Sequence, residues 1–100
     1  MDETAKPQND EQSLGEIDFI GYISSLAFQA MIFLGEIESP ISGKIEKHIP
    51  QAKLLIDTLI LLRDKTKGNL NEQENQLLEA SIYELQLKYV EHAQGVKKDG

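Results

Sequence analysis

Apolar residues gather in three stretches of this chain, and their spacing within each stretch predicts a helix. The first stretch, Phe19–Leu34 (FIGYISSLAFQAMIFL), has no charged residue and lies between Asp18 and Glu36. Asp18 is expected to cap the first turn, because its carboxylate can accept from the free N–H groups there. Gly35 is expected to end the helix in a left-handed conformation. A helix this apolar must be covered by a core, by another chain or by lipid.

A helical-wheel projection divides this first helix into two apolar faces of different width. The wide face covers about half the circumference and comprises Phe19, Ile20, Tyr22, Ile23, Leu26, Ala27, Ala30, Met31, Phe33 and Leu34. The narrow face repeats at intervals of four, three and four residues, as in a coiled-coil seam, through Gly21, Ser25, Phe28 and Ile32. The small residues on the narrow face would let a neighbouring helix approach closely.

The second helix is predicted from Pro50, a residue favoured at the first helical position, to about Lys67. Gly68 suits the position after its end. The main apolar stripe comprises Ala52, Leu55, Ile56, Leu59, Ile60 and Leu62. Leu54 and Leu61 lie on nearly the opposite side, so this helix also has a second apolar face.

The third helix is predicted to follow Asn71, with Glu74 completing a capping box, and to end at His92 or Ala93. One apolar stripe comprises Leu78, Ile82, Leu85 and Tyr89. A second stripe, more than 90° away on the wheel, comprises Ala80, Tyr83, Leu87 and Val90.

The connection between the first two helices, residues 36–49, is long for a compact bundle, which suggests a functional role. The pairs Ser39-Pro40 and Ser42-Gly43 predict turns. A two-stranded excursion is one interpretation. An irregular loop is favoured instead, held in place by isoleucines that recur every fourth position: Ile37, Ile41, Ile45 and Ile49.

These patterns predict one all-α domain, residues 17–93, in a chain of 100 residues. The architecture is a three-helix bundle, an αα-hairpin plus a hydrophobic first helix. Residues 1–16 are expected to be a disordered acidic tail and residues 94–100 a disordered polar tail. A monomeric bundle needs one apolar face per helix, so the surplus predicts completion by homo-oligomerisation. The predicted self-association face comprises Gly21, Ser25, Phe28, Ile32, Leu54, Leu61, Tyr83, Leu87 and Val90.

Charge and composition narrow the possible partners. Six acids and one base give residues 1–18 a net charge of −5, and the whole chain carries −7. No basic stripe for phosphates is present, so we expect no nucleic-acid partner. The absence of Cys suits a reducing cytoplasm, and no basic region precedes an apolar run at the start, so no secretion signal is expected.

Candidate chemistry is sparse. A metal site could be drawn from His48 and the nearby Glu36, Glu38 and Glu46, but no metal-binding spacing is present and a solvated loop is the favoured interpretation. His92 is expected to be a surface histidine at a helix end. Ser24 and Ser25 lie outside any nucleophile elbow, which favours a packing role. We therefore expect no catalytic, cofactor-binding or metal-binding residues, and no enzyme.

Two functions from different classes remain. The first is a non-enzymatic, self-associating module that binds another protein. The second is a membrane-associated protein with residues 19–35 in lipid. These seventeen uncharged residues are short for a span, which needs about 20, and acids flank them, so a membrane role is disfavoured.

Three segments resemble a known family: residues 34–37 (LGEI) with Gly43 following, residues 49–70 (IPQAKLLIDTLILLRDKTKGNL) and residues 77–90 (LLEASIYELQLKYV). Together they look like the small bacterial family called domain of unknown function 1844. The resemblance covers about residues 17–91, and its most specific part is KTKGNL, residues 65–70. It implies a short, cytoplasmic, mostly helical bacterial protein. It brings no catalytic or ligand-binding residues.

Overall fold

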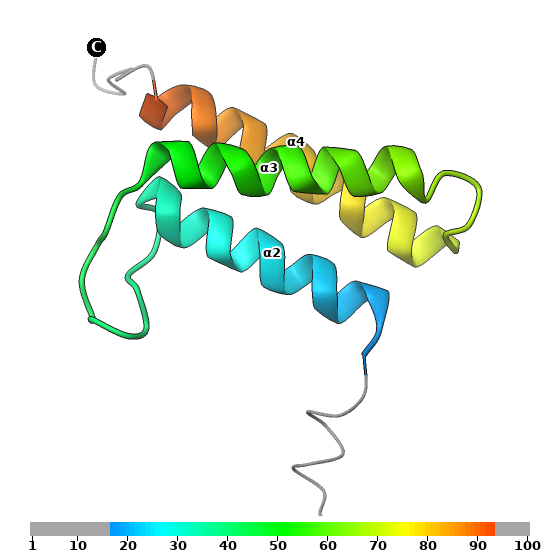
Figure 1. Cartoon of the computed structure of the whole chain (residues 1–100), viewed down its shortest axis with the longest axis horizontal. Helices are drawn as coiled ribbons and strands as arrows, with labels where there is room; N and C mark the ends of the chain where they lie inside the picture. Colours follow the sequence, from blue (N-terminus) through cyan, green and yellow to red (C-terminus); the bar gives the residue numbers. More distant parts are fainter. Residues whose placement is uncertain (1–16, 94–100) are drawn as a thin grey trace, which may run out of the picture.

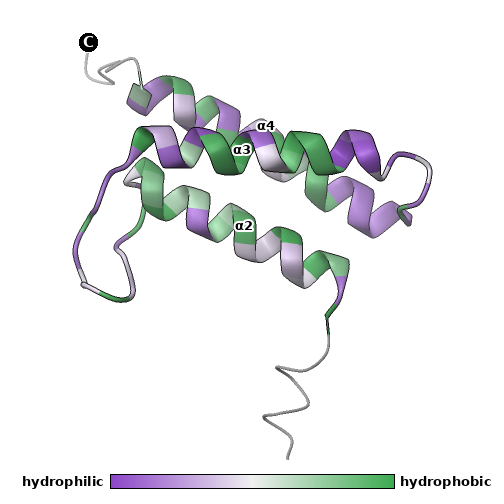
Figure 2. Ribbon diagram, in the orientation of Figure 1, coloured by the Kyte–Doolittle hydropathy of each residue, from purple (hydrophilic) through white to green (hydrophobic). Residues whose placement is uncertain are grey.

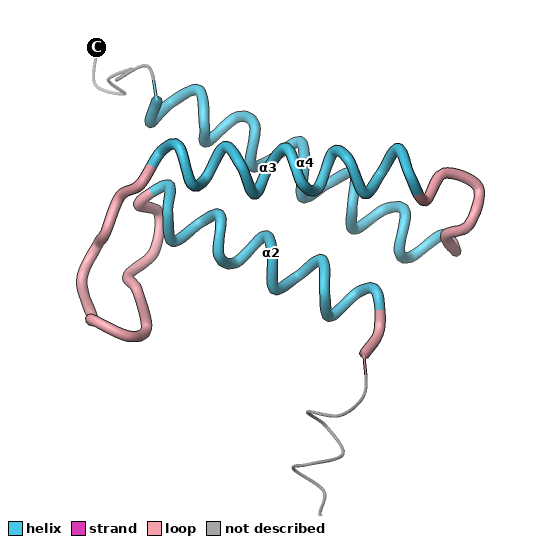
Figure 3. Tube along the Cα trace, viewed as in Figure 1, coloured by secondary structure: helices cyan, strands magenta, loops and turns pink. Residues whose placement is uncertain are grey.

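The computed structural model describes residues 17–93, most of which lie in three helices. Helix α2 spans Phe19–Leu34, α3 spans Ile49–Lys65 and α4 spans Glu72–Ala93. They alternate in direction, and each packs against the other two (Figures 1 and 3). The predicted all-α three-helix architecture is therefore confirmed within a single chain. The predicted tails, residues 1–16 and 94–100, lie outside the described residues.

Both ends of α2 are set by the residues that the sequence indicates. The Asp18 carboxylate accepts a hydrogen bond of 2.8 Å from the Gly21 N–H. At the other end Gly35 has a φ of +90°, and its N–H donates to the Ile32 carbonyl at 3.0 Å. Only glycine adopts such a left-handed backbone at little cost, so the chain turns away from the helix here.

Helix α3 begins one residue earlier and ends two residues earlier than predicted. It starts at Ile49, so Pro50 occupies the second helical position, and it stops at Lys65. The early end has a local cause, because the Thr66 hydroxyl donates to the Leu62 carbonyl at 2.6 Å and ties the chain back on the last turn. Gly68 then takes a φ of +86° within the turn that leads to α4.

Helix α4 starts with the predicted capping box. The Glu74 N–H donates to the Asn71 side chain at 2.8 Å, and the Asn71 N–H donates to the Glu74 carboxylate at 3.0 Å. These reciprocal bonds satisfy two backbone donors that the first turn would otherwise leave unpaired. Two residues three positions apart thus fix the start of α4.

A single core lies between the helices. Its buried members come from all three, namely Ile23, Leu26, Ala30 and Leu34 of α2, Ala52, Ile56 and Leu59 of α3, and Leu78, Ile82 and Leu85 of α4. The predicted stripes of α3 and α4 are confirmed, since their remaining members pack against this core. Figure 2 shows that α2 has the most uniformly apolar ribbon of the three. Among residues 17–93, no helix has both the length and the apolar content to cross a bilayer.

The buried face of α2 is narrower than predicted. Ile20 and Tyr22 belong to the predicted wide face, but 36% and 48% of their surfaces are exposed. Both lie at the margins of the wide face near the start of the helix, where α2 diverges from α3 (Figure 1). Two neighbouring helices therefore cover the centre of the apolar face and leave its edges to solvent.

The connection between α2 and α3 is an irregular loop, as favoured by the sequence, and no strand occurs within residues 17–93. The expectation that isoleucines hold it in place is wrong for Ile41 and Ile45, which are 95% and 53% exposed. Backbone hydrogen bonds shape it instead. The Ser39 N–H donates to the Lys44 carbonyl at 2.8 Å, and the His48 N–H donates to the Phe33 carbonyl at 2.7 Å.

Candidate interaction surface

Most of the predicted self-association residues remain exposed in the folded chain. Gly21 and Ser25 on α2 face solvent, as does Phe28, which is 50% exposed. The exposed fractions on α3 and α4 are similar, at 60% for Leu54, 53% for Leu61, 68% for Tyr83, 50% for Leu87 and 46% for Val90. Ile32 differs, because the loop that follows α2 covers part of it. The core of one chain is therefore complete without these side chains.

The structure does not bring the nine residues together in one surface. We call the predicted self-association residues of each helix the set of that helix. Each set lies on the side of its helix opposite the buried stripe, and the three helices surround one core. Their outer sides consequently point in different directions. A single flat partner could therefore not cover the exposed residues of all three helices at once.

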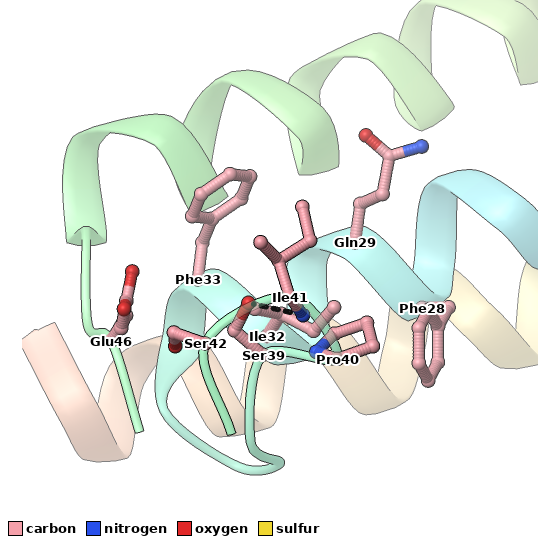
Figure 4. A pocket seen from close by; sticks show the side chains of 9 residues that line it. All are labelled: Phe28, Gln29, Ile32, Phe33, Ser39, Pro40, Ile41, Ser42 and Glu46. Atoms are coloured by element: carbon pink, nitrogen blue, oxygen red, sulfur yellow. Dashed lines mark hydrogen bonds between the residues drawn. The ribbon is translucent and has the colours of Figure 1, made fainter. Parts of the chain in front are cut away.

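The α2 set borders a hollow that the loop creates. Phe28, Ile32 and Phe33 form its α2 wall, and Pro40 and Ile41 face them from the loop. The hollow measures about 510 Å³ and is open to solvent (Figure 4). Sequence reasoning missed it, because the fold of residues 39–42 over the helix has no periodic signal.

A bent loop tip presents Ile41 at this hollow. The Gly43 N–H donates to the Ser39 carbonyl at 2.7 Å, and Gly43 has a φ of +75°. The Ser39 hydroxyl accepts from the Ile41 N–H at 3.2 Å, the bond drawn in Figure 4. These short-range bonds close the turn around Pro40. The large apolar side chain of Ile41 is therefore held in solvent.

A second, smaller hollow of about 280 Å³ lies between α2 and α4. Ser24, Ala27 and Met31 line it from α2, and Leu77 and Ser81 line it from α4. Phe28 borders both hollows. Phe28 thus connects the two hollows on the surface of the described chain.

A polar junction joins the start of the loop to the end of α4. The Glu36 carboxylate lies 2.5 Å from His92 Nε2 and 3.7 Å from Lys88 Nζ. All three side chains are less than one-third exposed. His92 was expected to be a surface histidine at a helix end, and its contact with Glu36 across 56 residues has no sequence signal. This junction fixes the direction in which the loop leaves α2.

Residues 16–91 match the family model described as domain of unknown function (DUF1844). The match covers α2, α3, the loop between them and all of α4 except its last two residues. The chain belongs to the DUF1844 family. No curated protein and no solved structure matches it.

Two segments that carry the DUF1844 resemblance, LGEI and KTKGNL, have structural roles in this fold. In LGEI, Leu34 is fully buried, Gly35 supplies the left-handed turn and Glu36 forms the polar junction. In KTKGNL, Thr66 closes α3, Gly68 reverses the chain and Leu70 packs on the core. These segments therefore position the helix ends.

The DUF1844 chain brings few reactive groups together. Within residues 17–93, no three His, Cys, Asp or Glu side chains are placed to hold a metal ion. The His48 ring instead lies edge-on to the Phe33 ring, with centroids 6.0 Å apart. Ser25 accepts a hydrogen bond of 3.2 Å from the Gln29 side chain on the surface of α2. The apolar surface, and not a polar cluster, is the prominent feature.

Proposed function

We propose that this DUF1844 chain is a non-enzymatic helical module that associates with itself and binds another protein. One observation carries the proposal. A complete core forms within one chain while large apolar side chains on all three helices stay about half exposed. Exposed apolar patches on otherwise complete folds usually mark protein interfaces. Cytoplasmic location is part of the proposal and is supported by the absence of Cys.

The location of the exposed apolar residues favours an interface over a random distribution of single apolar residues on the surface. Phe28 borders two hollows, and Ile41 is held in solvent by the turn that contains it. An aromatic ring beside a concave apolar wall is a common anchor in protein interfaces. Since the outer sides of the helices diverge, one side can serve self-association while another remains open for a different protein.

Sedimentation equilibrium of the full-length chain, from low micromolar to several hundred micromolar, tests self-association. We expect the average mass to rise with concentration above the monomer mass of 11.2 kDa. A constant monomer mass over the whole range would contradict the proposal. Affinity capture from the native organism with a tagged full-length chain would then identify the protein partner.

A further inference from the structure

We infer that self-association uses α2, with two copies of the chain packed antiparallel about a two-fold axis near Ser25. This inference rests on the proposed self-association and adds the surface and the geometry. In such a pairing, the first half of one α2 lies against the second half of the other. The loop of each copy then contacts the start of α2 in its partner.

The two most exposed large apolar residues of the described chain favour this direction. Ile17 is 90% exposed just before α2, and Ile41 is 95% exposed where the loop folds back over the second half of α2. Ile17 precedes Ser25 by eight residues, and Phe33 follows Ser25 by eight. A two-fold axis at Ser25 therefore brings Ile17 of each copy to the hollow of the other. A parallel pairing would instead set Ile17 against Ile17 of the other copy, and neither Ile17 would reach a hollow.

The same axis places further apolar groups opposite one another. Tyr22 precedes Ser25 by three residues and Phe28 follows it by three, so each tyrosine would face a phenylalanine of the other copy. Tyr22 is 48% exposed and Phe28 is 50% exposed. Aromatic pairs of this kind add to the energy of burial through edge-to-face or offset packing.

The available area suits a stable dimer. A fully exposed aromatic or large aliphatic side chain presents on the order of 200 Å². With the exposed fractions above, Ile17, Tyr22, Phe28 and Ile41 offer roughly 550 Å² per copy, or roughly 1,100 Å² per pair. A specific interface buries at least about 1,000 Å² in total, so these side chains alone reach that level.

No charge repulsion opposes the pairing along α2 itself. Phe19–Leu34 contains no charged residue, so no like charges meet between the two helices, and the acids near the contact are Asp18 beside Ile17 and Glu46 at the hollow. The outer side of α3 differs in this respect, because Lys53 and Asp57 form an exposed ion pair of 2.8 Å there and Asp64 and Lys65 follow. Desolvating such charges would cost energy that the uncharged α2 surface does not require.

Disulfide trapping in the full-length chain tests whether the α2 surface forms the contact, since the sequence contains no Cys. Helices that pack 8–10 Å apart bring facing Cα atoms to roughly 4–5 Å, within disulfide range. Under a mild oxidant, Ser25→Cys is expected to form a covalent dimer. The matched control Leu61→Cys, which is also exposed but lies on α3, is expected to remain monomeric on a non-reducing gel.

A second variant measures the contribution of the loop. Ile41 is almost fully exposed in the single chain, so Ile41→Lys leaves the folded monomer unchanged. In the dimer it would place a charge in the apolar hollow of the interface, and we expect the dimer dissociation constant to rise at least about tenfold. Leu61→Lys is the control and is expected to leave this constant unchanged.

The outcomes separate the geometry from the function. Trapping at Ser25→Cys together with weakening by Ile41→Lys supports the α2 dimer. Trapping at Leu61→Cys alone, or an unchanged dissociation constant for Ile41→Lys, overturns the α2 dimer and leaves self-association standing. A wild-type chain that is monomeric throughout overturns both.

Discussion

Leu59 and Leu61 lie two residues apart on α3, and the structure predicts opposite outcomes when each is shortened to alanine. Leu59 is fully buried between the helices, whereas Leu61 is 53% exposed on the outer side. Both changes remove the same atoms from the same helix, and alanine and leucine have similar helix propensities. Any difference between the two variants therefore reports burial in the bundle.

The expected magnitudes follow from the transfer energy of the deleted groups. Removing three buried carbon atoms costs about 0.8 kcal/mol each, and the cavity left in the core adds to this. We expect Leu59→Ala to lower the free energy of unfolding by about 3–4 kcal/mol. About half of the Leu61 side chain is already in water, so Leu61→Ala should cost about 1 kcal/mol or less.

Urea denaturation followed by circular dichroism measures both values, at one low and one high protein concentration. The low concentration isolates the single chain, because association stabilises the folded state by mass action. Equal destabilisation by the two variants at low concentration would refute the assigned packing of α3. For this small domain a difference of 2 kcal/mol also appears as a separation of about 10 °C in Tm, which gives an independent check.

Three further predictions concern the helix ends and the charged side chains. Asp18→Ala removes the cap of α2 and should lower the unfolding free energy by about 1 kcal/mol in urea melts. Glu36→Gln weakens the junction with α4 and should lower the unfolding free energy by about 1–2 kcal/mol in the same melts. The control Glu38→Gln changes an exposed residue and should alter the unfolding free energy by less than about 0.5 kcal/mol. Equal effects of the two variants would contradict the junction. The pKa of Lys53 is raised above 10.5 because Asp57 accepts a hydrogen bond from its ammonium group. The stabilisation of the wild type over Lys53→Met should therefore be present at neutral pH and disappear as the pH rises above 10.5, and a pH-independent difference would exclude this pair as its source.

Local features of the sequence identified the helices. The cap at Asp18, the left-handed Gly35 and the capping box of Asn71 and Glu74 involve residues no more than four positions apart. Hydrogen bonds over such distances form in the helix itself and do not depend on the rest of the fold. The apolar periodicity of α3 and α4 likewise identified their buried stripes, because a helix places every third and fourth residue on one side.

Candidate surface residues were identified only in part. The spacing singled out Phe28, Leu54 and Tyr83 as apolar residues beyond the core stripes, and they are exposed in the fold. The wheel could not show that these residues point in different directions, since it treats each helix separately. It also assigned Ile20 and Tyr22 to the wide apolar face without showing that they stay partly exposed, because it cannot show where a neighbouring helix diverges.

What the sequence alone determined about this protein is its set of three capped helices, each with its own buried stripe and a second apolar side. The packing of the three helices brought Glu36 to His92 and Lys88, left Ile41 of the loop in solvent and set Phe28 between two hollows. The physical reason is the distance along the chain over which each interaction acts. Caps and periodicity arise between near neighbours, whereas contacts between segments depend on how all three helices pack around one core.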